Sequence, residues 1–117
     1  MVIVVMSSLL PERSRLGKAL AADLGWPFVD AGGAGDGWRQ EMRALIERTL
    51  DRRDHLVIVC PALRAADRES LGGMRQVRFI GLSDPPTEPL PDGDAIRFDG
   101  SQEPSTLVPL IRRELGR

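Results

Sequence analysis

The chain has 117 residues, 42% of them apolar, which predicts one folded domain. Its formal charge of −1 argues against a nucleic-acid partner, since binding nucleic acid needs a basic face. The single cysteine, Cys60, excludes an internal disulfide, and with His55 as the only histidine a structural zinc site is not expected. No secretory signal or membrane-spanning stretch is found, so we expect a cytoplasmic protein without a membrane partner.

The first elements are a strand, a helix and a second strand. A continuous β-branched run at 2–6 predicts a strand that is buried on both faces. Leu16, Leu20 and Leu24 recur at helical spacing, and Gly25 follows them as a helix terminator. Residues 27–30 predict the second short strand.

The middle of the chain continues the alternation. A loop at 31–37 contains four glycines, and Asp36 is expected to cap the next helix. That helix carries one apolar stripe, opposite a face of mixed charge, made of Trp38, Met42, Leu45, Ile46, Thr49 and Leu50. A third strand at 55–60, a short helix at 65–71 and a fourth strand at 77–82 follow.

The last part of the chain completes an α/β pattern. A connector at 83–93 holds four prolines, and a fifth strand at 95–98 comes next. The final helix runs from about 105 to 115, and Pro109 is tolerable only near its first turn. Its inward side chains are expected to be Leu107, Leu110, Ile111 and Leu115. Regular alternation predicts a five-stranded parallel sheet with helices on both faces, whose ligands bind beyond the carboxyl ends of the strands.

Two segments resemble the bacterial gluconate kinases, which are relatives of shikimate and adenylate kinases among the P-loop kinases. One is the strand at 2–6 with an eight-residue turn and residues 16–30, and the other is the strand and following segment at 55–68. The resemblance spans most of the chain and implies a P-loop NTPase-like three-layer sandwich. The family's substrate-binding segment and mobile lid correspond here to the short stretches 31–37 and 83–93. We therefore expect residues 1–117 to form a single kinase-like domain without lid and substrate insert.

The phosphate-binding motif of that family is substituted in this chain. A P-loop reads G-x-x-x-x-G-K-[ST], with lysine on the phosphates and the hydroxyl on Mg²⁺. Ungapped alignment puts Ser7 and Glu12 at the glycines, Arg13 at the lysine and Ser14 at the hydroxyl. Pro11 removes one N–H from the cradle. The Glu12 carboxylate would cost roughly 4 kcal/mol beside a phosphate charge about 4 Å away in a medium of effective dielectric ~20.

Other residues have a functional and a structural interpretation. Asp30 stands where the family carries an acid near Mg²⁺ and substrate, and alternatively is a turn residue that ends a strand. Arg64 and Arg68 match basic residues of the family's third-strand segment. With Arg13 they form either an anion site or a set of solvated surface arginines. Cys60 is interpreted as a small buried residue at a strand end.

Three functions remain open from the sequence. The first, which the lost motif favours, is a catalytically silent kinase relative without cofactor or catalytic residues, acting as a scaffold or interaction module for an unknown protein partner or as a homodimer. The second is a binder of a small anion or metabolite through Arg13, Arg64 and Arg68. The third is a residual ATP-dependent carbohydrate kinase, in which Arg13 replaces the lysine and Ser14 holds Mg²⁺.

Overall fold

Five strands and three helices are found in the part of the chain that the computed structural model describes, residues 1–7, 10–31, 37–61, 76–83, 95–99 and 102–116. The strands and helices in chain order are β1 (Val2–Met6), α1 (Leu10–Leu24), β2 (Phe28–Asp30), α2 (Trp38–Asp51), β3 (Leu56–Cys60), β4 (Val77–Ser83), β5 (Ala95–Asp99) and α4 (Pro104–Leu115). The helix expected at 65–71 and nearly all of the 83–93 connector lie outside these residues, as do most of the glycines of the 31–37 loop.

The five strands form one parallel sheet in the order β2-β3-β1-β4-β5. β1 is the central strand, and its Val4 pairs with Ile58 of β3 and with Phe79 of β4. All five residues of β1 are buried, as are all five of β3, because helices cover both faces. The predicted five-stranded parallel sheet is therefore confirmed.

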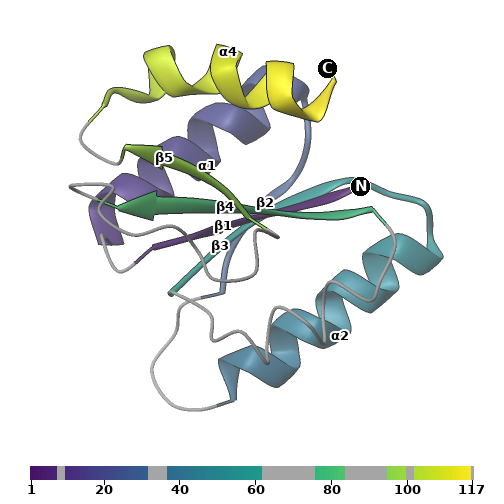
Figure 1. Cartoon of the computed structure of the whole chain (residues 1–117). Helices are drawn as coiled ribbons and strands as arrows, with labels where there is room; N and C mark the ends of the chain where they lie inside the picture. The colour runs from purple at the N-terminus through teal and green to yellow at the C-terminus, as the bar shows by residue number, and fades with distance from the viewer. Residues whose placement is uncertain (8–9, 32–36, 62–75, 84–94, 100–101, 117) are drawn as a thin grey trace.

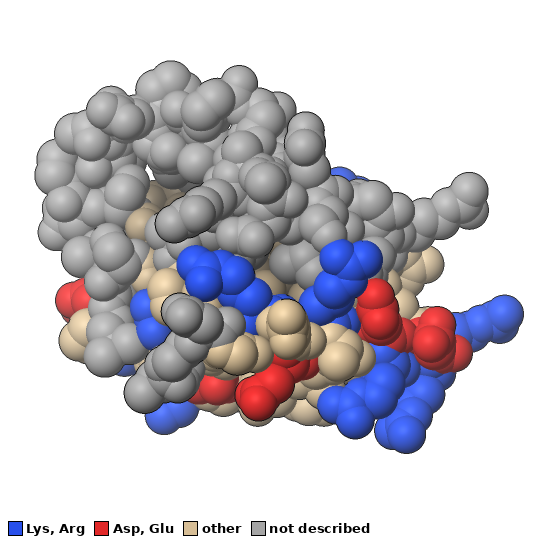
Figure 2. Space-filling model, turned by 90° about the horizontal axis from the view of Figure 1, so that it is seen from below, with Lys and Arg blue, Asp and Glu red and all other residues tan. Residues whose placement is uncertain are grey.

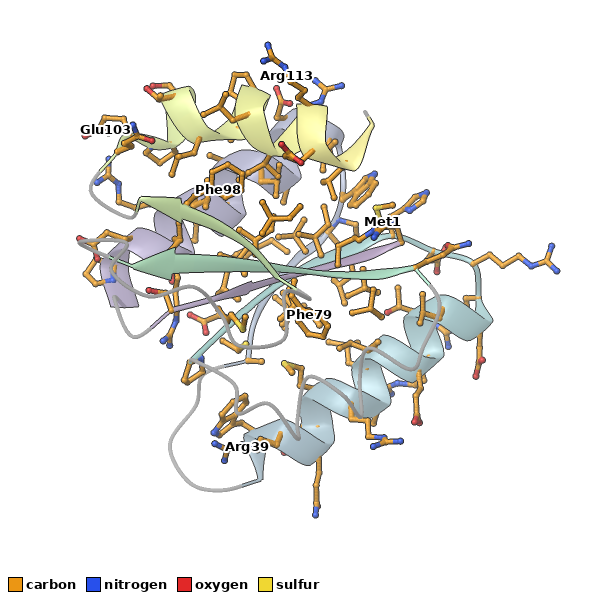
Figure 3. The ribbon with its side chains drawn as sticks, in the orientation of Figure 1. Met1, Arg39, Phe79, Phe98, Glu103 and Arg113 are labelled. Carbon is orange, nitrogen blue, oxygen red and sulfur yellow. The ribbon has the colours of Figure 1, made fainter. Side chains whose placement is uncertain are left out.

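The helices lie in two layers, with α1 and α4 on one face of the sheet and α2 on the other (Figure 1). Alternate side chains of β1 enter the two layers, so that Ile3 and Val5 pack toward α1 and α4 while Val4 packs toward α2. Phe98 and Phe79 point to opposite faces in the same way (Figure 3). The architecture is the three-layer sandwich that the sequence predicted.

The end of α1 follows the expected glycine rule. Gly25 adopts a φ of +71°, in the left-handed region that glycine enters without a side-chain clash. The Trp26 N–H donates to the Ala21 carbonyl at 2.9 Å and the Gly25 N–H donates to the Ala22 carbonyl at 3.3 Å. These two bonds form a Schellman motif, which ends the helix and returns the chain toward β2.

Gly17 lets α1 approach the sheet closely. A Cβ atom at this position would overlap Val59 Cγ1 and lie 2.8 Å from Phe28 Cε2. A glycine in the middle of a helix costs about 1 kcal/mol relative to alanine, so its presence here has a packing reason. The close approach places the first turns of α1 beside the carboxyl ends of β1 and β3.

The start of α2 differs from the expectation. Gly37, rather than Asp36, occupies the N-cap position and makes no side-chain cap hydrogen bond, while Asp36 lies outside the described residues. The expected apolar stripe is confirmed, since Met42, Ile46 and Thr49 are buried against the sheet.

Two expectations for α4 are wrong. Leu110 is 38% exposed, while Val108, which was not expected to face inward, is buried with Leu107 and Ile111. At about 100° per residue, the stripe runs from Leu107 through Ile111 to the partly buried Leu115, which lies close to Val108 on the helix surface, whereas Leu110 lies on the other side of Leu107. Pro109 stands in the second turn, not the first, and both Pro109 and the residue whose carbonyl loses its partner, Ser105, are exposed to solvent.

Among the described residues, no helix is long and apolar enough to cross a membrane.

Candidate functional site

The carboxyl ends of β1, β3 and β2 meet at one edge of the sheet, next to the beginning of α1. Backbone hydrogen bonds continue past the strands, from the Ser7 N–H to the Cys60 carbonyl at 3.1 Å and from the Ala31 N–H to the Val59 carbonyl at 2.8 Å. They hold Ser7, Cys60 and Ala31 in one row. This is the edge at which ligands bind in sheets of this type.

Arg13 points inward at this edge. Its side chain is only 3% exposed, and its Nη1 donates a hydrogen bond of 2.8 Å to the Ser7 carbonyl, which is itself buried. The interpretation of Arg13 as a solvated surface arginine is therefore wrong. Helical spacing explains why Arg13 is buried. Arg13 precedes Leu16 by three residues and Leu20 by seven, so it lies on the buried stripe of α1.

The charge of Arg13 has no acidic partner in the described part of the chain. The Nη1–Ser7 contact is the one hydrogen bond that Arg13 makes there, and the buried Nε has no partner at all. A carbonyl oxygen is neutral, so this bond satisfies one N–H without neutralising the charge. A buried charge without a counter-ion is costly, which marks the position as unusual.

Ser14 and Asp30 are joined to each other. Ser14 Oγ donates to Asp30 Oδ2 across 3.3 Å, linking the first turns of α1 to the end of β2. Ser14 is half-buried and Asp30 is exposed. No group of three or more metal-ligating side chains occurs among the residues described, and a metal or substrate role for Asp30 stays a prediction.

Cys60, the last residue of β3, lies close enough to Arg13, Asp30 and Arg39 for their charges to affect its thiol. Burial raises the pKa of its thiol to about 12, an effect that the charges of Arg13 and Arg39 partly oppose and that of Asp30 reinforces. The thiol is therefore protonated at neutral pH and carries no charge that could pair with Arg13. The expectation of a small buried residue at a strand end is confirmed.

Arg39 is a residue of this region that sequence reasoning missed. It was assigned to the solvated face of its helix, but it stands at the end of α2 that lies under the carboxyl edge of the sheet (Figure 3). Its guanidinium carbon lies 4.5 Å from the centre of the Trp38 ring. The available signal was its position just after the loop that leaves β2, because that loop begins at the edge where ligands bind.

The face of the molecule on the α2 side carries both signs of charge. Figure 2 shows basic and acidic side chains interspersed on this face rather than gathered in one patch. Arg43 and Glu47 of α2 pair across one helical turn, with 3.2 Å between Nε and Oε1.

Of the site residues predicted from sequence, the structure brings together Arg13, Ser14 and Asp30 at the carboxyl edge of the sheet. Arg64 and Arg68 lie outside the described residues.

Comparison with known proteins relates this chain to kinases by structure alone. No family model and no curated protein matches the sequence. A sugar kinase from Janibacter sp. HTCC2649 has a TM-score of 0.79 at 18% identity, covering 98% of this chain and 94% of that one. A gluconokinase from Sinorhizobium meliloti 1021 has a TM-score of 0.74 at 20% identity, covering 99% and 91%. A shikimate kinase from Aquifex aeolicus has a TM-score of 0.67 at 16% identity, covering 99% and 96%. The chain therefore has the fold of the small P-loop kinases, as its resemblance to the gluconate kinases implied.

Proposed function

We propose that this chain is a protein of kinase fold that does not transfer phosphate, and that it acts as a scaffold or interaction module, through a protein partner or a second copy of itself. The observation that carries the proposal is the buried hydrogen bond between Arg13 and the Ser7 carbonyl. It occupies the turn in which a P-loop would hold nucleotide phosphates.

The contact between Arg13 and Ser7 involves two parts of a phosphate cradle, the lysine position and a glycine position of the loop. A P-loop lysine extends toward the β- and γ-phosphates, whereas Arg13 turns back onto the loop's own backbone at 2.8 Å. Ser7 replaces a glycine that would give the loop its conformational freedom, and its N–H is already bonded to the Cys60 carbonyl. Both residues are thus committed to internal contacts.

The remaining parts of the turn also disfavour phosphate. Glu12 stands in the first turn of α1, where its charge is favourable to the helix dipole and unfavourable to an approaching polyphosphate. Ser14 gives its hydroxyl hydrogen to Asp30. Phosphoryl transfer depends on positioning and charge stabilisation by all of these parts together, so their joint loss supports a role without catalysis.

Turnover is tested by measuring ADP formation from ATP and Mg²⁺ in the presence of gluconate, other sugar acids and shikimate. We expect no ADP above the substrate-free background. Ser14→Ala is the matched control, because a contaminating kinase would give the same rate with both proteins. Substrate-dependent ADP formation that disappears in Ser14→Ala would contradict the proposal.

The scaffold role is tested separately by sedimentation velocity over a wide range of protein concentration. A concentration-dependent increase in mass would support a second copy as the partner, and a constant monomer mass would contradict the homodimer.

A further inference from the structure

We propose that this chain forms a homodimer in which β2 pairs with β2 of a second copy, so that the two sheets become one. The paired strands run antiparallel about a two-fold axis at Val29, which sets Phe28 opposite Asp30 of the partner subunit. The inference rests on the proposed function, in which a second copy is one of two kinds of partner, and it names the surface that the copy uses.

The open edge of β2 presents backbone groups of Phe28. In the described part of the chain, β2 is an edge strand that pairs with β3 on one side. The Val57 N–H donates to the Pro27 carbonyl at 3.0 Å, and the Ala31 N–H donates to the Val59 carbonyl at 2.8 Å. Alternate residues of a strand bond to the same neighbour, so the N–H and C=O of Phe28 face away from β3. Neither group has a backbone partner among the described residues.

Antiparallel pairing of two such edges supplies these missing partners. Residues that lie opposite each other at hydrogen-bonded positions of an antiparallel pair exchange both N–H···O bonds. Phe28 stands at such a position opposite the partner's Asp30, and the two-fold axis repeats the pair on the other side of Val29. Pairing also covers the half-exposed side chains of Phe28 and Val29, which lie on opposite faces of β2.

The charges beside this edge are complementary under the same symmetry. Lys18 of α1, the one lysine of the chain, lies with its Nζ 6.0 Å from the centre of the Phe28 ring. It is exposed and makes no ion pair within the described residues. Asp30 is also exposed, and its bond with Ser14 places its carboxylate on the α1 face of the strand, where Phe28 also points.

The two-fold axis therefore brings Lys18 of one copy beside Asp30 of the partner subunit, and repeats the contact in the other direction. A carboxylate has acceptor sites beyond the one that Ser14 occupies, so the two contacts are compatible. The short length of β2 limits pairing with unrelated strands, and these ion pairs select the register for a second copy.

The helices leave room for the second copy. α1 packs mainly over β3, where Gly17 lies against Val59, rather than over the edge strand. Because neighbouring strands are about 4.8 Å apart, the two α1 helices are separated by about three strand spacings, or roughly 14 Å. Helices in contact are about 8–10 Å apart, so the two copies of α1 do not collide. α2 contacts β1, which lies farther from this edge.

The test is a charge swap, with dimerisation measured by sedimentation velocity over a range of protein concentration. Lys18→Glu sets two carboxylates together at each contact, and Asp30→Lys sets two ammonium groups together. We expect each single variant to raise the Kd of the dimer by about tenfold or more. The double variant restores opposite charges and should return the Kd close to that of the wild type.

Arg15→Glu is the matched control for the charge swap. Arg15 lies on the same helix and is exposed, but it pairs with Glu103 at α4, so its variant should leave the Kd unchanged. A wild-type protein that stays monomeric would overturn the inference. A double variant that dimerises no more tightly than the single variants would overturn it too.

Amide hydrogen exchange at Phe28 locates the contact and separates the inference from the proposed function. Exchange should slow as the protein concentration rises through the Kd, because the Phe28 N–H becomes bonded in the dimer. A dimer whose Phe28 amide exchanges equally fast at all concentrations would contradict the pairing of β2 and leave a second copy as the partner through another surface. Substrate-dependent ADP formation would instead contradict the proposed function, whatever the state of β2.

Discussion

Ser14 Oγ donates a hydrogen bond to Asp30 Oδ2 across 3.3 Å, which joins the beginning of α1 to the end of β2. In a P-loop, the hydroxyl at the position of Ser14 holds Mg²⁺. Here the hydroxyl and the carboxylate bind each other.

Replacing Ser14 with alanine tests how much this bond contributes. Asp30 is exposed and water can replace the lost donor, so we expect Ser14→Ala to lower the free energy of unfolding by about 0.5–1.5 kcal/mol. Urea unfolding with and without Mg²⁺ is the measurement, and Mg²⁺ should leave the midpoint unchanged. Stabilisation of the wild type by Mg²⁺ that Ser14→Ala abolishes would show that the hydroxyl holds the metal after all.

Gly17 is the second position with a definite prediction. Alanine has the better helix propensity by about 1 kcal/mol, but its Cβ would overlap Val59 and come within 2.8 Å of Phe28. Overpacking of a core contact costs about 1–3 kcal/mol, so we expect Gly17→Ala to be destabilising in urea unfolding. In a double-mutant cycle, Val59→Ala should relieve part of this loss. A stabilised Gly17→Ala protein would mean that α1 does not approach β3 so closely.

Cys60 predicts how stability changes at alkaline pH. Its thiol pKa is raised from 9.0 to about 12 in the folded protein, so the unfolded chain releases this proton first. Stability is therefore unaffected by this group below about pH 8.5 and falls between pH 9 and 12, by up to about 1.4 kcal/mol per pH unit. The chain has no tyrosine and one lysine, Lys18, so few other side chains titrate in this range.

The measurement for Cys60 is urea unfolding at several pH values between 8 and 11 for the wild type and Cys60→Ala. The variant is less stable throughout because it leaves a cavity, but its stability should decline less steeply with pH. Parallel declines in the two proteins would show that the thiol ionises equally in the folded and unfolded states.

The docking of α4 separates buried contacts from surface ion pairs. Leu107 is 1% exposed, whereas the Arg15–Glu103 pair, 2.8 Å long, has side chains that are more than half exposed. We expect Leu107→Ala to cost about 2–5 kcal/mol and Glu103→Gln less than about 1 kcal/mol, with the smaller effect reduced further by salt. Equal losses in urea unfolding would assign the attachment of α4 to its ion pairs instead.

The strands were predictable because their signal is local. The β-branched runs of β1 and β3 are buried on both faces, and their bounds agree with the sequence pattern within one residue. The site was less predictable because it depends on where side chains point and how the helices lie against the sheet. The burial of Arg13 was within reach of helical spacing, but its contact with the Ser7 carbonyl depends on the path of the intervening turn. The proximity of Arg39 to Cys60 depends on how α2 lies under the sheet, which no local pattern specifies.

Isothermal titration of the protein with ATP and Mg²⁺ tests most directly the proposal that the turn between β1 and α1 does not bind nucleotide phosphates. The buried contact of Arg13 with Ser7 and the charge of Glu12 predict no measurable heat of binding at millimolar ATP. Micromolar binding of ATP that weakens in Arg13→Gln would contradict the account, because it would require Arg13 to leave the Ser7 carbonyl and bind phosphate.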